Sequence, residues 1–147
     1  MTLLRVFVLS ITLGVATGCA SLATKYGPAL GSVAGGYSET KLSATTYEVR
    51  FQANSFTNAD TVGALLLRRA AELTLEAGQR YFVVTDRQPL SLGEAGDPAL
   101  LATVRILDAP SPNAADAVEV IRQTDAMAGG LLSARAREHL GRLASTR

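Results

Sequence analysis

The sequence predicts one small domain of the α/β (α+β) class, in which a three-stranded or slightly larger mixed sheet is packed by two helices. Residues 47–53 alternate between apolar and polar side chains, residues 59–77 repeat apolar side chains at helical spacing, and residues 80–85 form an almost continuous apolar run. These patterns are typical of a half-buried strand, an amphipathic helix and a strand buried on both faces. A length of 147 residues also fits a single domain.

The first strand should turn one row of side chains toward a core and the other row toward solvent. The inward row is Tyr47, Val49, Phe51 and Ala53, and the outward row is Glu48, Arg50 and Gln52. In the helix that follows, we expect Thr57 as the N-cap and Gly78 just beyond an end near Ala77.

Four charged side chains lie outside the apolar stripe of this helix: Arg68, Arg69, Glu72 and Glu76. Residues three or four positions apart are neighbours on a helix surface. We interpret the four as a ladder of ion pairs that faces solvent. The alternative is an internal network that ties the helix to the first strand through Glu48 and Arg50.

The second strand, at residues 80–85, follows the helix closely. A strand-helix-strand unit of this length joins parallel strands through a right-handed crossover, so we expect these two strands to be parallel. Residues 88–98 hold several Gly and Pro residues and should form a loop before a third strand at 100–107. A second helix should lie within 113–128, and a short C-terminal helix within 131–143.

The first 18 residues have the layout of a secretory signal peptide. Arg5 provides positive charge near the amino terminus, residues 6–15 carry no charge and are mostly apolar, and small residues follow. The apolar run is short for a membrane span, which takes about 20 residues. We therefore expect residues 1–18 to be removed as a leader.

The sequence Ala16-Thr17-Gly18-Cys19 resembles the lipobox of bacterial lipoproteins. The resemblance implies cleavage between Gly18 and Cys19, a diacylglycerol thioether on the Cys19 sulfur and a further acyl chain on its new amino group. Several chains hold a protein on a bilayer, whereas one chain binds only reversibly. The alternatives are a soluble secreted protein cleaved near Gly18 and an anchor that is not cleaved.

Residues 19–36 should form the lipidated cysteine and a flexible tether, because small residues, Gly and Pro dominate them and Lys25 is their only charge. Ala20 and Ser21 resemble the sorting signal that directs envelope lipoproteins to the outer membrane, which implies the periplasmic face of that membrane. The folded domain would then occupy residues 37–128. Residues 129–147 would form a basic amphipathic helix or tail.

The composition argues against several kinds of partner. The chain has 14 Lys+Arg against 13 Asp+Glu, a net charge of +1, whereas nucleic-acid binders usually carry a strong basic excess. The single Cys excludes a disulfide within the chain, and the single His argues against a histidine metal site or a catalytic triad. Apart from the acyl chains on Cys19, we expect no cofactor, no bound metal, no nucleic acid and no catalytic residues.

Several short motifs lie between residues 36 and 122. They are GYSE at 36–39, YEVRF at 47–51, LLRRAAELTL at 66–75, YFVV at 81–84 and NAADA at 113–117. Together with the lipobox, this series is similar to a small family of uncharacterised envelope lipoproteins of alphaproteobacteria and their relatives. The resemblance implies an envelope address and the same architecture, and it carries no known activity.

The segment Tyr37, Ser38 and Glu39 is the candidate partner-binding site. An aromatic ring beside a carboxylate can line a groove next to the first strand and hold a partner. The alternative is a purely local role, in which Gly36 makes the turn into the domain, Tyr37 packs on the sheet, and Ser38 and Glu39 cap or pair with their neighbours.

From these features we expect a non-enzymatic structural or protein-interaction module, held by membrane lipid through Cys19 and bound to an envelope protein. One alternative is a binding protein or hydrolase for a small cell-wall fragment that uses Tyr37 and Glu39. A second is a membrane-surface protein whose tail, basic through Arg135, Arg137 and other arginines, contacts anionic lipid. The tail could equally pack on the domain.

Overall fold

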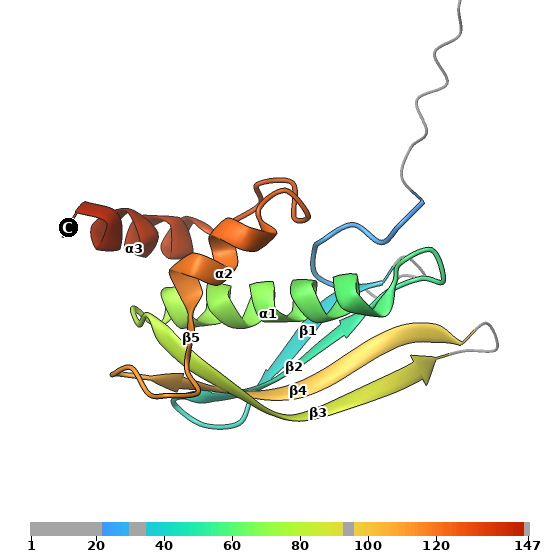
Figure 1. Cartoon of the computed structure of the whole chain (residues 1–147), viewed down its shortest axis with the longest axis horizontal. Coiled ribbons are helices and arrows are strands. Elements are labelled where there is room, and N and C mark those ends of the chain that lie inside the picture. Colours follow the sequence, from blue (N-terminus) through green and yellow to red (C-terminus); the bar gives the residue numbers. More distant parts are fainter. Residues whose placement is uncertain (1–21, 30–34, 93–95, 146–147) are drawn as a thin grey trace, which may run out of the picture.

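The computed structural model describes residues 22–29, 35–92 and 96–145, and these form a five-stranded sheet and three helices (Figure 1). In chain order the elements are β1 (Gly36–Lys41), β2 (Thr46–Gln52), α1 (Ala59–Glu76), β3 (Tyr81–Leu92), β4 (Asp97–Leu107), β5 (Ala115–Asp116), α2 (Ala117–Thr124) and α3 (Ala134–Ser145). The predicted mixed α and β class is confirmed. Gly18 and Cys19, the predicted cleavage and lipidation site, lie outside the described residues.

The sheet has the order β1-β2-β4-β3-β5, and each of these neighbouring pairs is antiparallel. Because β2 and β3 are each antiparallel to β4, they run parallel to each other, as predicted for the strands on either side of α1. They are not hydrogen-bonded neighbours, however, because β4 follows β3 in the chain and lies between β3 and β2. Antiparallel strands can be joined by a short connection, and only residues 93–96 separate β3 from β4 in the chain.

The β3–β4 hairpin also replaces most of the loop predicted at residues 88–98. The two strands pair along nearly their whole length, with an irregularity between Thr85 and Gln88. Pro89 favoured a loop in the sequence, but a proline is tolerated in a strand that lies at the edge of a sheet. Beyond its first two residues, β3 has no strand on its other side among the described residues.

Figure 1 shows three layers, in which α1 lies between the sheet on one side and α2 with α3 on the other. The inward row predicted for residues 47–53 is confirmed, because Val49, Phe51 and Ala53 are buried and Tyr47 is half-buried. Since α1 is covered on both sides, it buries charged as well as apolar residues. Its buried residues are Val62, Leu65, Leu66, Arg68, Arg69, Ala70, Ala71, Glu72, Leu73, Thr74 and Leu75.

The start of α1 differs by one residue from the prediction. Asn58 is the N-cap, and its side-chain oxygen accepts a hydrogen bond from the backbone N–H of Thr61 at 2.8 Å. Thr57 is buried instead, and its hydroxyl oxygen accepts from the backbone N–H of Thr24 at 2.9 Å. The threonine is therefore used to fix the incoming chain and not to cap the helix.

Part of the predicted tether belongs to the folded domain. Tyr26 is only 7% exposed, and its ring centre lies 5.1 Å from that of Tyr37 and 6.4 Å from that of Phe51. The backbone of residues 27–29 pairs with the edge of β1, where Ala29 N–H donates to the Tyr37 carbonyl at 2.7 Å. The folded unit therefore begins before residue 37, because one buried aromatic ring holds a segment whose composition suggested a linker.

The C-terminal region packs on the domain. Ala136 of α3 is buried, while Leu132, Leu140 and Leu143 are half-buried against the core. The preceding helix, α2, ends at Thr124, earlier than predicted. Among the described residues, none of the helices combines the length and the hydropathy that a membrane-spanning segment requires.

Candidate functional site

Strand β1 divides the three candidate residues between two faces of the sheet. Successive residues of a strand point to opposite faces. Tyr37 lies opposite buried Phe51 in the register and Glu39 contacts α1, so both point toward the helix layer. Ser38, between them, points to the other face of the sheet, which no described helix covers and which we call the uncovered face. The structure therefore brings Tyr37 and Glu39 together and separates Ser38 from them.

Arg69 of α1 binds the side chains of both Tyr37 and Glu39. Its Nη2 donates to Glu39 Oε1 at 2.8 Å and its Nε donates to Glu39 Oε2 at 3.3 Å, a two-pronged pairing of guanidinium with carboxylate. The same guanidinium lies 4.6 Å from the centre of the Tyr37 ring, within the range of a cation–π interaction. The groups proposed for a partner are thus already engaged by the protein itself.

Arg68 joins α1 to the C-terminal layer. It is fully buried and its Nε donates to Glu72 Oε1 at 3.1 Å. Its Nη1 donates to the Ile121 carbonyl at 3.2 Å, and its Nη2 donates to the Leu131 carbonyl. A further ion pair of 3.3 Å links Nη1 to Asp125. Arginine suits this position because its planar head carries five N–H donors.

Glu72 is the centre of this cluster, which we call the arginine network: Tyr26, Glu39, Arg68, Arg69 and Glu72. Besides the bond from Arg68, Glu72 Oε2 accepts from Arg69 Nη1 at 3.0 Å and from the Tyr26 hydroxyl at 2.7 Å. A buried charge is costly unless it is paired and hydrogen-bonded. Here one carboxylate accepts from three side chains, two on α1 itself and one, Tyr26, in the incoming chain.

The network corrects the interpretation of the charged residues of α1 as a solvent-facing ladder. Arg68, Arg69 and Glu72 are buried, because α2 and α3 cover the side of α1 that the sheet leaves open. The alternative, an internal network that ties α1 to a strand, is confirmed, but the strand residues that take part differ from those predicted. Glu48 and Arg50 lie on the opposite face of the sheet, and Glu39 of β1 takes that role.

Tyr26, Tyr37 and Arg69 each have a raised pKa. Burial raises the pKa of Tyr26, and the neighbouring Glu72 carboxylate raises it further. Burial also raises the pKa of Tyr37, although the charge of Arg69 acts in the opposite direction. For Arg69, burial lowers the pKa, but the hydrogen bond to Glu39 and the charges of Glu76 and Glu39 outweigh it, so the pKa is raised. At neutral pH both phenols keep their protons and Arg69 stays charged, which suits a structural tie.

Two cavities flank the candidate residues. On the helix side, a groove of about 240 Å³ runs between Tyr26, Tyr37, Arg69 and Glu72 and the start of the α3 layer at Leu131. On the uncovered face of the sheet, a shallow pocket of about 270 Å³ is lined by Ser38, Glu39, Thr40, Glu48, Arg50, Leu90 and Leu101. The second pocket therefore combines both signs of charge with apolar side chains.

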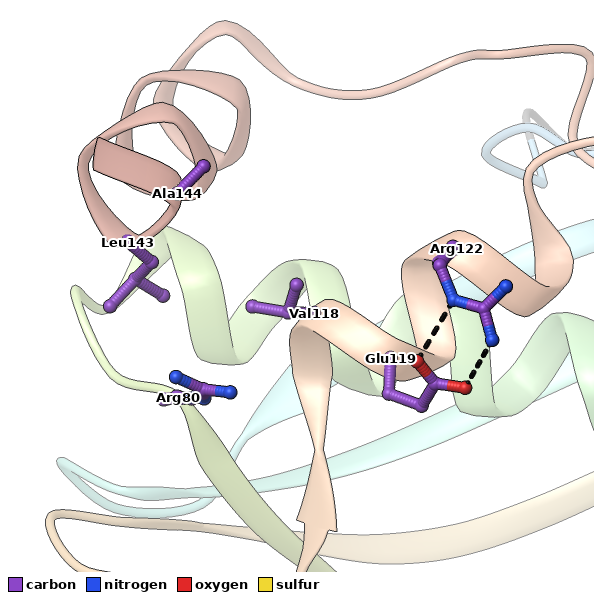
Figure 2. Close-up of a pocket in the computed structure, with 6 residues that line it drawn as sticks. All are labelled: Arg80, Val118, Glu119, Arg122, Leu143 and Ala144. Carbon is purple, nitrogen blue, oxygen red and sulfur yellow. Dashed lines mark hydrogen bonds and ion pairs between the residues drawn. The ribbon is translucent and has the colours of Figure 1, made fainter. Parts of the chain in front are cut away.

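A third cavity lies away from these residues, between the start of β3, α2 and the end of α3. Figure 2 shows Arg80, Val118 and Leu143 around this space, which measures about 280 Å³. The two hydrogen bonds drawn there run from Arg122 to Glu119, at 2.9 and 2.6 Å, and together with a bond from Gln123 they lower the pKa of Glu119 to about 2. Arg80 is paired as well, with Asp116 at 2.7 Å.

Sequence reasoning missed Tyr26 and the burial of Arg68. A lone aromatic residue in a stretch of small residues was the available signal for Tyr26. For Arg68 the available signal was the spread of apolar side chains around much of α1, which is expected of a helix covered on more than one side.

Comparisons of the chain with protein-family models, with curated proteins and with solved structures find no match. The resemblance to the envelope lipoprotein family therefore stays a prediction.

Proposed function

We propose that this protein is a membrane-anchored bacterial envelope lipoprotein that acts as a non-enzymatic protein-interaction module on the periplasmic face of the outer membrane. The anchor would be a diacylglycerol thioether and an N-acyl chain on Cys19. The support for it is the apolar run at residues 6–15, followed by small residues and the only Cys of the chain.

The non-enzymatic part of the proposal rests on one observation: the candidate residues Tyr37 and Glu39 are bound by another residue of the domain itself. The Glu39 carboxylate and the Tyr37 ring both bind Arg69, and Arg69 is in turn paired with Glu72. A general acid or base needs a pKa near the working pH and access to a substrate. These residues instead connect β1 to α1.

The uncovered face of the sheet is the surface that we propose for a protein partner. Arg50 and Glu48 of β2 are half-buried there beside Leu101 of β4, and Ser38 and Thr40 of β1 border them. Mixed charge around half-buried apolar side chains is typical of the surfaces that non-obligate protein partners use. An envelope protein therefore fits this face better than a charged polymer does.

The anchor is tested by growth with a fatty-acid analogue that can be labelled. We expect the full chain to take up the label and to sediment with membranes, and Cys19→Ala to do neither. Labelling of Cys19→Ala at the level of the original protein would contradict the lipid anchor.

The interaction surface is tested by a photo-crosslinking residue placed at Arg50 in cells. We expect a discrete crosslinked envelope protein, identified by mass spectrometry. The matched control carries the same residue at Gln123, which is exposed on α2 in the layer farthest from the sheet. Equal products from both positions, or none from Arg50, would contradict a specific partner on the sheet face.

The alternative, binding or hydrolysis of a small cell-wall fragment, is favoured by the groove of about 240 Å³ beside Tyr37 and Glu72. Under this alternative, purified protein should bind muropeptides in calorimetry and lose that binding in Tyr37→Ala. Formation of new muropeptide products would identify a hydrolase.

A further inference from the structure

The chain is fixed to the domain within a few residues of the proposed anchor. The Leu22 carbonyl accepts from the Asn54 side chain at 2.7 Å. Two residues later, the Thr24 hydroxyl accepts from the Asn54 backbone N–H at 2.8 Å, while Thr24 N–H donates to Thr57 at 2.9 Å. From Leu22 onward, the incoming chain is therefore held against the turn that precedes α1.

This attachment sets a short limit on the distance between the domain and Cys19. Three peptide units separate Cys19 from Leu22. A fully extended chain spans at most about 3.6 Å per residue, so the two residues lie within about 11 Å of each other. The predicted tether of residues 19–36 would have reached several times farther. If Cys19 carries lipid, the end of the domain around Leu22 is at the level of the lipid headgroups.

Large apolar side chains are exposed at this same end of the domain. Leu22 is 67% exposed and Phe56, in the turn that holds it, is 66% exposed. Leu131, which is 58% exposed, borders the groove formed by Tyr26 and the residues after it. Exposed apolar residues that gather at one place indicate an interaction site. The exposed charges of residues 22–29 and 54–60 are Lys25 and Asp60, which are opposite in sign.

We propose that the end of the domain formed by Leu22 and Phe56 docks on the surface of the lipid bilayer. The proposal rests on the lipid anchor at Cys19 proposed above and gives the anchored domain a fixed orientation. Apolar side chains at the headgroup boundary gain by leaving water, and the anchor holds them there at high local concentration. Because Lys25 and Asp60 offset each other, the contact depends on apolar side chains more than on anionic lipid.

The experiment uses the mature lipidated chain, reconstituted in vesicles of phosphatidylethanolamine and phosphatidylglycerol. Cys19 is the only Cys of the chain, and its sulfur is blocked by lipid in this form. A single engineered cysteine can therefore be labelled with a polarity-sensitive dye. Phe56→Cys reports on the proposed contact. The control is Leu42→Cys, because Leu42 is 55% exposed and lies in the turn between β1 and β2, at the opposite end of the sheet (Figure 1).

We expect the dye at residue 56 to emit at shorter wavelength on vesicles than in solution, and to be severalfold less quenched by aqueous iodide than the dye at residue 42. A second pair of variants, in which Leu22→Ser is added to each, should reduce the protection at residue 56 and leave residue 42 unchanged. Both labelled positions are exposed, so the variants should unfold at the same urea concentration as the original chain.

The outcomes separate the two proposals. Equal quenching at residues 56 and 42, in protein whose intact mass includes the acyl chains, would overturn the docking and leave the anchor in place. An intact mass with a free thiol at Cys19, and protein that stays out of the vesicle fraction, would overturn the anchor and with it the docking.

Discussion

Arg68 depends on its partners because it is charged and has no exposed surface. Without Arg68, Glu72 would lose one of its two arginines, and the Ile121 and Leu131 carbonyls would lose their donor. Breaking a buried ion pair by removing one partner costs about 3–5 kcal/mol. We therefore expect Arg68→Met to lower the free energy of unfolding by about that amount, measured by urea denaturation.

Arg122→Met is the matched control for Arg68. Arg122 also pairs with a glutamate of its own helix, Glu119, but both side chains are well exposed. Exposed pairs contribute little to stability, so the control should unfold close to the original protein. A similar loss in both variants would contradict the importance of burial in the arginine network.

Gly36 is the residue at which β1 meets the incoming chain. Its φ is +134°, and an added Cβ would lie 2.6 Å from the Gly27 carbonyl oxygen and 2.9 Å from the Ala29 nitrogen. We expect Gly36→Ala to separate residues 27–29 from β1 and to cost about 1–3 kcal/mol, the range typical of such backbone strain. Hydrogen exchange of the Ala29 amide, which now donates to Tyr37, should become much faster.

Gly63→Ala provides the contrast, because nothing lies within 4 Å of a Cβ at this position of α1. Alanine is favoured over glycine in a helix by about 0.5–1 kcal/mol, so this variant should be slightly more stable. An unchanged Ala29 exchange rate in Gly36→Ala would mean that the strand edge accommodates the methyl group.

At the scale of elements, residues 22–29 decide how the domain is held. We expect Tyr26→Ala to destabilise the protein by about 3–5 kcal/mol, as for other buried aromatic residues, and also to leave Glu72 without one of its donors. Lys25→Ala, one residue earlier and exposed, should have no measurable effect. Equal stability of the two variants in urea would support the flexible tether that composition predicted.

The packing of α3 should make stability depend on pH. Burial lowers the pKa of His139 below its usual 6.5, and the nearby charge of Arg142 lowers it further. As pH falls through 6.5, the unfolded chain takes up the proton before the folded protein does, so stability is lost until the folded His139 is also protonated. We expect the free energy of unfolding to fall between pH 7.5 and 5.5, and His139→Gln to show a smaller fall. An identical pH profile for both would contradict this packing.

Periodicity predicted those elements whose signal is local. The alternation in β2 and the helical repeat in α1 each report which side of a single element is buried. β1 and the far half of the β3–β4 hairpin were missed because they lie at edges or on the uncovered face, where polar residues and Pro89 resemble a loop. The common direction of β2 and β3 was predicted, but the insertion of β4 between them was not, because a local pattern does not contain which strands become neighbours.

The candidate site was predicted only in part for a similar reason. Tyr37 and Glu39 were identified as unusual, but their partner Arg69 is 30 residues away in sequence from Glu39. Which strand residues face α1 depends on the register, and a shift of one residue exchanges Glu39 for Ser38. The sequence therefore indicated which side chains are chemically unusual, but not which residues bind one another.

At the scale of the whole molecule, most of β3 forms an edge of the sheet that no described strand covers, and another copy of the chain could pair there. Pro89 lies opposite Leu100 of β4. Along β4 the backbone N–H and C=O groups point alternately toward β2 and toward β3, and the N–H of even-numbered Ile106 donates to Thr45 on the β2 side. The backbone groups of Leu100, also even-numbered, therefore point toward β2 and away from Pro89. The Pro89 backbone thus faces the open edge, where a missing N–H discourages pairing with another chain.

We expect Pro89→Thr to increase self-association, measured by sedimentation velocity over a range of protein concentrations, with little change in thermal stability. Gln88→Thr raises strand propensity next to it, but its backbone already bonds to β4, so it should stay as monodisperse as the original protein. If Pro89→Thr sediments in the same way as Gln88→Thr, the proline does not protect this edge.

The place of β4 between β2 and β3 also determines when the protein can fold. β2 and β3 precede β4 in the chain, yet neither contacts the other until residues 97–107 arrive to bridge them. A chain that crosses a membrane from its amino terminus would therefore hold an incomplete sheet, and α1 would lack the cover of α2 and α3, until the last third of the chain emerges. Such late, long-range contacts slow folding. A chaperone that shields hydrophobic surface during this interval should therefore raise the yield of native protein.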